Sequence, residues 1–172
     1  MIEFIEGYED YFGDWVWEMS IASLLTLELM LLSFLLSCFL GLLIALLRIS
    51  KNKYSSNFSK FYIGFFRGVP VLVILYWIYF AMPELGYEVL MISSFTAAIL
   101  GLGIHGSAFM AEVFRSGIQA LNIGQMEASL SLGMTPLNAL SYIILPQAIR
   151  IGLPPTANFA VGLLKETALC SI

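Results

Sequence analysis

The run from Ser20 to Leu47 constrains the fold of this chain more than any other stretch, because its only charged residue is Glu28. A hydrocarbon core roughly 30 Å thick is crossed by about 20 helical residues, so this run can span a membrane even when it is tilted. The whole chain is 59 % hydrophobic and 12 % charged, whereas soluble domains are about 45–50 % apolar and about 25 % charged. We therefore predict an all-α integral membrane protein.

Three further apolar runs bring the expected number of membrane spans to about four. The second run is interrupted at Val69-Pro70, where the proline removes a backbone donor and disfavours a helical Val69, so we expect a kink or a new helix start. The fourth run is interrupted by Pro154-Pro155 and again by the charged pair that follows. The predicted spans are 20–47, 61–82, 87–111 and 151–172, in a single transmembrane domain at 19–172 with a polar loop at 113–150.

The segment that precedes the first span, residues 1–18, is acidic and aromatic and contains no Lys or Arg. Such a composition suits an external amphipathic segment that rests on the membrane surface, with Trp15 and Trp17 at the level of the headgroups. No basic region and no small-residue cleavage site precede the first apolar run, so we expect no secretory signal and a first span that stays in the mature protein.

The distribution of basic residues predicts the orientation of the chain. Arg48, Lys51, Lys53 and Lys60 lie in or beside the first polar loop, which marks it as cytoplasmic. The N-terminal segment and the turn at 83–88 contain no basic residue, so both are expected outside. Residues 113–150 then fall in the cytoplasm, in a multi-pass protein whose N-terminus is outside.

Within this loop, the stretch from Leu121 to Pro146 predicts two short helices joined by a tight turn. Asn122 and Gln125 can form a capping box at the first helix, and Gly133 suits the left-handed residue that ends it. Thr135 can cap the second helix, with Pro136 at its first position, and we expect this helix to end at Leu145-Pro146. From periodicity alone, an interfacial hairpin with a solvated Glu127 fits as well as a functional element.

The order of residues in this stretch resembles the EAA motif in the membrane subunits of ABC importers. Glu127-Ala128, Gly133 six positions later, and then Ile143 and Leu145-Pro146 match that motif, with Ser129 in place of its second alanine. The resemblance covers nearly all of residues 20–172. Four stretches together look like the polar amino-acid importer permeases: LLTLELMLLSFLLSCFLGLLIALLRIS, FFRGVPVLVILYWIYFAMPELG, AFMAEVFRSGIQALNIGQMEASLSLGM and ILPQAIRIGLPPTANFAVGLLKETAL.

This resemblance implies a type I ABC importer permease in a bacterial inner membrane, with no cofactor of its own. It implies ATPase subunits that hold ATP and Mg²⁺, a second permease subunit that is identical or homologous, and an extracytoplasmic solute-binding protein that delivers a polar amino acid. The residues expected to couple the permease to its ATPase are Gly124, Glu127, Ala128, Gly133, Leu145 and Pro146.

Permeases of that family normally continue past the position of Ile172 with a further span, so we expect the C-terminal span to be missing. A fragment, a naturally truncated product and a divergent subunit would each explain this. The alternative function is accordingly a truncated, non-transporting membrane interaction subunit of such a complex.

Ionisable residues at membrane depth are candidates for the substrate pathway, because each is costly to insert. Arg67 has two interpretations, a pathway residue or an anchor that reaches the cytoplasmic face, and Glu28 is equally open. Lys165 and Glu166 are adjacent on a helix and cannot face each other, so they line a pathway or mark a break in the helix. Glu112 and Arg115, three residues apart, favour a structural ion pair.

Other features favour packing and exclude several classes of function. His105 between small residues indicates a close helix contact rather than a proton relay, and the aromatic run at 76–80 indicates packing and an interfacial belt.

A net charge of −4 argues against nucleic acid as a partner. The sequence contains no set of catalytic residues, no Walker motif, and no internal repeat of the kind typical of secondary transporters. Cys38 and Cys170 lie apart in apolar runs and predict neither a zinc site nor a redox pair.

Overall fold

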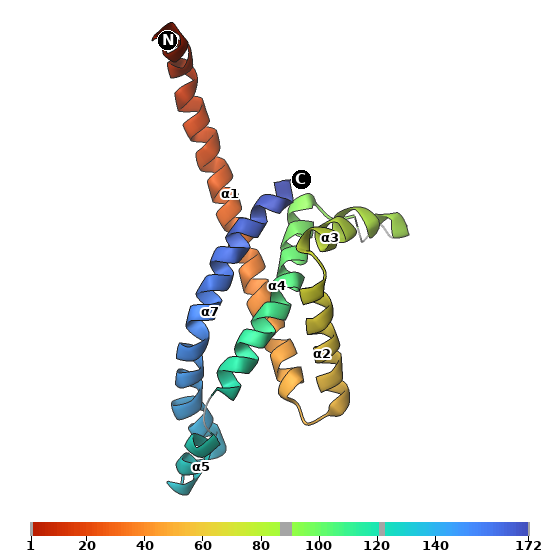
Figure 1. Cartoon of the computed structure of the whole chain (residues 1–172), viewed down its shortest axis with the longest axis vertical. Coiled ribbons are helices and arrows are strands. Elements are labelled where there is room, and N and C mark those ends of the chain that lie inside the picture. Colours follow the sequence, from red (N-terminus) through yellow and green to blue (C-terminus); the bar gives the residue numbers. More distant parts are fainter. Residues whose placement is uncertain (1, 87–90, 121–122, 172) are drawn as a thin grey trace.

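The computed structural model of this chain describes residues 2–86, 91–120 and 123–171, and within those residues it contains helices and no strand (Figure 1). Four long helices form the framework, and shorter helical pieces connect them. The long helices are α1 (Ile2–Ile49), α2 (Lys53–Gly68), α4 (Ser94–Gln119) and α7 (Leu145–Glu166). The shorter pieces are α3 (Val71–Tyr76), η1 (Trp77–Ala81), η2 (Pro83–Leu85), α5 (Ile123–Ser131), α6 (Pro136–Asn138), η4 (Ala139–Ile144) and η5 (Thr167–Ser171).

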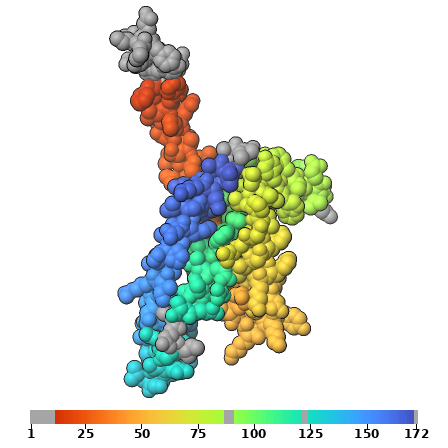
Figure 2. Space-filling model, viewed as in Figure 1, coloured from red at the N-terminus to blue at the C-terminus, as the bar shows by residue number. Residues whose placement is uncertain are grey.

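Helix α1 is longer than a membrane is thick. Its 48 residues span about 72 Å at 1.5 Å per residue, more than twice a hydrocarbon core of about 30 Å. The N-terminal part of the helix accordingly projects beyond the bundle (Figures 1 and 2). The boundary expected after residue 18 is therefore not a break in the helix, and the amphipathic segment continues directly into the first span.

Helix α4 is the centre of the bundle and contributes buried side chains to all three clusters of the core. One cluster joins Leu102 to Leu29 and Leu163, a second packs Ala111 against α1 and α2, and a third packs Ala97 beneath α3. Small residues let α1 approach α4 closely, as expected for helices in lipid. At Gly41 an added Cβ would lie 2.6 Å from the Cβ of Met110.

The second predicted span, 61–82, is divided between two helices. Helix α2 begins at Lys53, because Asn52 caps it by accepting a hydrogen bond from the backbone N–H of Tyr54 at 2.9 Å. The expected interruption before Pro70 is confirmed, since Val69 is extended (φ −92°, ψ 130°). The helical segments on either side of it, Lys53–Gly68 and Val71–Leu85, are bent by 101°, so the second half leaves the bundle sideways (Figure 2).

The third span lies further along the chain than predicted. Helix α4 starts at Ser94 rather than near residue 87, because Ser93 caps it and accepts from the backbone N–H of Thr96 at 3.2 Å. The helix also runs past Ala111 to Gln119, so the connection between long helices is shorter than the predicted loop at 113–150. Residues 87–90, where the predicted span begins, lie outside the described residues.

By length and composition, two of the described helices can cross a membrane: Phe12–Ile49 and Ser94–Gln119. The bent pair of α2 with the segment after it makes a third span if it is counted as one. The fourth predicted span, 151–172, falls on α7, which is not among them. Helix α7 nevertheless continues through Pro154 and Pro155.

The segments that connect the long helices lie at two opposite ends of the bundle (Figure 1). The connection from α1 to α2 and the hairpin of α5 lie at one end, and the N-terminus, α3 and the last turn of α7 lie toward the other. Arg48, Lys51 and Lys53 therefore share an end with α5. Which side of the membrane this end faces stays a prediction from the basic residues.

Candidate functional site

The hairpin of α5 and α6 has the local geometry that its sequence predicts. Gly133 adopts a left-handed conformation (φ +81°) and ends α5. An added Cβ there would meet nothing within 4 Å, so the backbone angle alone favours glycine. Thr135 accepts from the backbone N–H of Asn138 at 3.3 Å, with Pro136 at the start of the next helix. The predicted capping role of Asn122 lies outside the described residues, while the Gln125 side chain is bonded elsewhere.

The hairpin presents its predicted coupling residues to the surface. Gly124, Glu127, Ala128 and Gly133 are all exposed, and so are Leu145 and Pro146. Ser129 instead is buried, and its hydroxyl donates to the Gln125 carbonyl at 2.7 Å. The glutamate and its small neighbours thus form an open face.

Three large apolar side chains of the same hairpin are exposed too, and sequence reasoning did not identify them as functional. Leu132 is 84 % exposed, Leu137 73 % and Tyr142 72 %. The structure leaves all three uncovered. Exposed apolar side chains of this size indicate an interaction surface. We call Glu127, Ala128, Leu132, Leu137 and Tyr142 the hairpin face.

The second helix of the hairpin does not end at Leu145-Pro146, contrary to prediction. The π-helical turn Ala139–Ile144 leads directly into α7, which begins at Leu145. The helix tolerates Pro146 because this residue lies in the first turn of α7, where a backbone N–H would not donate to a carbonyl of the same helix. In addition, the Gln147 side chain donates to the Gln125 side chain at 3.0 Å, which joins α7 to α5. Hairpin and α7 are therefore connected both by the backbone and by a side-chain bond.

A groove of about 460 Å³ runs between α4 and α7 and contains Arg67 from α2. The Arg67 guanidinium carbon lies 5.2 Å from the centre of the Phe109 ring, a cation–π distance. Glu112 and Ser116 from α4 and Asn158 from α7 also line it. The groove therefore combines a cation, a carboxylate and neutral polar groups.

Arg67 lies in the last turn of α2, about 21 Å along the helix from Lys53. Its backbone is therefore at the end of α2 away from the basic loop, whereas its side chain reaches Phe109 and lines a groove with Glu112 on α4. Its two sequence interpretations, a pathway residue and an anchor at the cytoplasmic face, both stay predictions.

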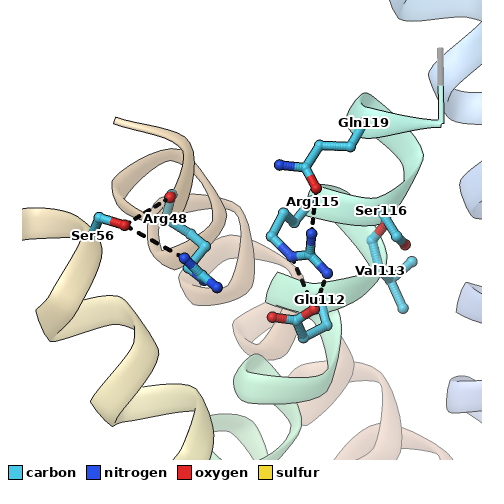
Figure 3. A network of polar contacts seen from close by, with 7 residues as sticks. All are labelled: Arg48, Ser56, Glu112, Val113, Arg115, Ser116 and Gln119. Carbon is cyan, nitrogen blue, oxygen red and sulfur yellow. Dashed lines mark hydrogen bonds and ion pairs between the residues drawn. The ribbon is translucent and has the colours of Figure 1, made fainter. Parts of the chain in front are cut away.

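Glu112 and Arg115 form an ion pair, with an Arg115 Nη2 to Glu112 Oε2 distance of 2.6 Å (Figure 3). Arg115 also donates from Nε to the same oxygen at 2.9 Å and from Nη1 to Gln119. Nearby, Arg48 of α1 contacts Ser56 of α2 through its Nη1 at 3.4 Å and its carbonyl oxygen at 3.2 Å. The first set lies within the last turns of α4 and pairs the charge of Glu112, whereas the second joins the end of α1 to α2.

The other pathway candidates lie apart from the Arg67 groove. Glu28 is exposed on α1, Lys165 is exposed near the end of α7, and Glu166 is half-buried. The Glu166 Oε2 atom is buried with no hydrogen-bond partner within the described part of the chain. None of these three belongs to the described lining of the groove, so the four candidates do not form one cluster. Helix α7 ends at Glu166.

His105 lies where small residues bring helices together, as its sequence setting predicts. It is 6 % exposed, and its ring centre lies 5.3 Å from that of Phe109. At the neighbouring Gly106 an added Cβ would lie 2.5 Å from Cζ of Phe159 on α7. The His105 Nδ1 atom is buried without a hydrogen-bond partner among the described residues.

The match to a family model covers residues 37–172, and the family is described as "Binding-protein-dependent transport system inner membrane component". The chain is 48 % identical over 129 residues to "Probable amino-acid permease protein YxeN" of Bacillus subtilis (strain 168), covering 75 % of this chain and 58 % of that protein. It is 38 % identical over 174 residues to "Arginine transport system permease protein ArgU" of Corynebacterium glutamicum, covering 95 % and 54 %. The chain thus spans less than two thirds of the length of these relatives. It belongs to the family of binding-protein-dependent transport system inner membrane components.

Solved structures agree with this assignment. The crystal structure of an amino acid ABC transporter with histidines matches with a TM-score of 0.76 and 39 % identity, over 90 % of this chain and 74 % of that chain. An inward-facing structure of the MetNI methionine ABC transporter matches with a TM-score of 0.73 at 20 % identity, over 91 % and 74 %, which speaks for the fold alone. The predicted all-α, type I ABC importer permease fold is confirmed.

Proposed function

We propose that this chain is the transmembrane permease subunit of an ATP-driven importer of polar amino acids. Alternating access in this importer is driven by a separate ATPase that acts through the α5 hairpin. The chain itself catalyses no reaction and binds no cofactor, since ATP and Mg²⁺ are held by the ATPase. Its membership of the inner-membrane component family supports a location in a bacterial inner membrane.

The observation that carries this proposal is the exposed hairpin face at the end of the bundle that also carries the basic loop. With the N-terminus outside, this end is cytoplasmic, where an ATPase would bind. The uncovered Leu132, Leu137 and Tyr142 supply apolar contact area, and Glu127 supplies a charge that orients the partner. The exposed Ala128 and Gly133 allow close approach.

The connection between the hairpin and α7 supports a route for the movement. Helix α7 is continuous with the hairpin through η4, and the Gln125–Gln147 bond fastens it to α5. The same helix forms one wall of the groove that contains Arg67. A rigid-body displacement of the hairpin would therefore move that wall and open or close the groove.

The groove supports a polar, zwitterionic substrate. The planar guanidinium of Arg67 can bind a carboxylate with two hydrogen bonds, while Asn158 offers an oxygen acceptor toward an ammonium group. Glu28, Lys165 and Glu166 are proposed for other parts of the pathway. Relatives named as amino-acid permeases support the same class of substrate.

Three kinds of partner complete the transporter. A second permease subunit, identical or homologous, forms the other half of the pathway, and an extracytoplasmic solute-binding protein delivers the substrate. Lipid surrounds the apolar surface that remains. The family description refers to binding-protein-dependent transport and so supports the solute-binding protein as a partner.

The test is uptake of radiolabelled arginine, glutamine and histidine by cells that express the complete transporter. Glu127→Lys should abolish uptake while the amount of this chain in the membrane stays unchanged. Glu84→Lys, which makes the same charge change at an exposed glutamate at the opposite end, is the matched control and should leave uptake intact. Wild-type uptake by the Glu127 variant would refute the coupling role.

The same hairpin face would also serve a non-transporting interaction subunit. That function predicts co-purification of the ATPase with the chain, dependent on Glu127, but no uptake of any amino acid by the wild-type complex. Uptake by the wild type therefore decides between the two functions, and co-purification alone does not.

A further inference from the structure

The segment of α3 and η1 begins where the hydrocarbon region ends. Ile74 and Ile78 of this segment pack against Ala97 in the first turn of α4. Helix α4 rises about 39 Å over its 26 residues, more than a hydrocarbon core of about 30 Å, so its first turn and the segment packed on it lie near one edge of that core. After the 101° bend, the next two turns leave the bundle sideways (Figure 1). Their axis is therefore close to the membrane plane.

The side chains of this segment suit the boundary between lipid and water. Residues 71–82 contain no charged side chain but include Tyr76, Trp77, Tyr79 and Phe80. Trp77 is 58 % exposed, and the other three aromatic side chains are exposed as well. Tyr and Trp concentrate at membrane–water interfaces because they join an apolar ring to one polar group. The opposite face, with Ile74 and Ile78, packs onto the core.

An apolar cleft of about 340 Å³ lies in the angle between α2, α3 and α4. Phe66 of α2, Ile78 of η1, and Leu100 and Ile104 of α4 are among its lining residues, which are all aliphatic, aromatic or methionine side chains. Leu100 and Ile104 lie about 9 and 15 Å along α4 from its first residue, and therefore at the depth of acyl chains. Water is not stable in a cleft of this character.

We propose that α3 and η1 lie flat in the outer membrane–water interface and that an acyl chain of an outer-leaflet phospholipid occupies the cleft beneath them. The lipid headgroup then lies beside Trp77, and its chain runs down along Leu100 and Ile104. The depth of the cleft and its wholly apolar lining favour an acyl chain over a segment of a water-soluble binding protein. The assignment to the outer leaflet, unlike the depth, rests on the proposed function.

The test is the fluorescence of Trp77 in vesicles of phosphatidylcholine brominated near the headgroup, in mid-chain or near the chain end. The full chain carries Trp15→Phe and Trp17→Phe, so that Trp77 is the only fluorophore of its kind. Quenching should be strongest with bromine near the headgroup and weakest near the chain end. Strongest quenching near the chain end would show that the segment dips into the membrane, and it would overturn the proposal.

Filling the cleft tests the acyl chain itself. Ile104→Phe should remove most of the quenching by mid-chain bromine, because the added ring occupies the space of the lipid chain. Leu43→Phe, at an exposed position on α1, is the matched control and should leave quenching unchanged. Unchanged quenching in the Ile104 variant, or quenching by aqueous iodide in place of bromolipid, would refute occupation by lipid. Bromolipid quenching that is lost when two copies are cross-linked would assign the cleft to a second copy of the chain.

A second measurement tests the same depth without the tryptophan variants, in case those variants do not fold. A spin label at Trp77→Cys, with Cys38→Ala and Cys170→Ala, should collide with both oxygen and a water-soluble nickel chelate, as expected at the interface. Collision with oxygen alone would overturn the proposal. Separately, reduction of the label by an impermeant reagent reports which side of the membrane it faces. A label on the cytoplasmic side would contradict the proposed orientation of the chain but not the interfacial depth of the segment.

Discussion

The contact between α1 and α4 and the hairpin of α5 and α6 are both rich in small residues, but the molecule uses them in opposite ways. In the α1–α4 contact, Ser33, Ser37 and Ala45 are fully buried, and the Ser37 hydroxyl donates to the carbonyl of Gly103 at 3.2 Å. In the hairpin, Ala128 and Gly133 remain exposed. The first set brings two backbones of this chain together, while the second leaves a surface on which another backbone can come equally close.

This difference separates packing from recognition. Small residues that are covered need no partner, and a change there should act on stability. An uncovered small residue such as Ala128, which lies on the hairpin face, contributes little to stability through packing because it contacts little of its own chain. A change there should act on assembly with the ATPase.

The largest expected effect is on the hairpin face. Replacing Leu132, Leu137 and Tyr142 together with Ser should weaken binding of the ATPase by more than about 100-fold, since three aromatic or apolar anchors worth about 1 kcal/mol each sum to about 3 kcal/mol, and 1.4 kcal/mol is a factor of ten. The measurement is the amount of ATPase that co-purifies with the chain over a range of concentrations.

The control for this prediction replaces exposed apolar residues of α1, Leu24 and Leu35, with Ser. These changes should leave ATPase binding unchanged. An equal loss of ATPase binding in both variants would mean that the ATPase does not bind the hairpin face specifically.

Gly41→Ala should have the next largest effect, and on stability rather than on binding. The added Cβ would lie 2.6 Å from Cβ of Met110 and 3.0 Å from the Ser107 carbonyl oxygen, so neither neighbour can move without moving the backbone of α4. We expect a loss of about 2 kcal/mol and a Tm lower by about 4 to 8 °C, measured on the purified protein in detergent.

Gly64→Ala is the matched control, because an added Cβ at Gly64 would meet nothing within 4 Å. It should keep or slightly raise the Tm, since alanine is the better helix former. A Tm for the Gly41 variant as high as that of the control would mean that α1 and α4 are not held in close contact.

Gly133→Ala should have a smaller and local effect. The left-handed backbone conformation costs a non-glycine residue about 1 to 2 kcal/mol, and open space around the site means that no clash is added. Hydrogen–deuterium exchange should therefore become faster in 123–138 and stay unchanged in α4. Faster exchange across the whole chain would instead indicate that the hairpin is part of the global fold.

The smallest expected effect concerns the bond between Gln125 and Gln147. An exposed neutral hydrogen bond is worth about 0.5 to 1.5 kcal/mol, so Gln125→Ala should reduce uptake only a few-fold. Gln147→Ala should do the same, and the double variant should be no worse than either single variant. Additive losses would show that the two side chains act independently and that the bond does not transmit movement.

Much of the hairpin could be predicted because its signals are local. A left-handed glycine at Gly133, a capping threonine at Thr135 and a proline behind it each act on their own neighbours, and the structure reproduces all three. The continuation of this hairpin into α7 could not be predicted, because Pro146 ends a helix in some settings and begins one in others. The local sequence does not decide between them.

Arg67 illustrates a second limit. Its sequence shows a cation in an apolar span and nothing of its surroundings, so both a pathway and an anchoring interpretation fit. The surroundings depend on where α2 begins, which Asn52 decides, and on Phe109, which lies 5.2 Å from the guanidinium although it is far along the chain. A contact of this kind exists only when α2 is packed on α4.

The sequence by itself determined that the chain is a helical membrane protein, that its basic loop and its hairpin belong to one side, and where most turns occur. These properties follow from the transfer of apolar residues into lipid, from the bias of Lys and Arg, and from capping within a few residues. Only the tertiary structure decided the sideways exit of α3, the groove around Arg67 and the exposure of the hairpin face. Each of these depends on which helices are neighbours, and that is settled by packing between residues that are remote in the chain.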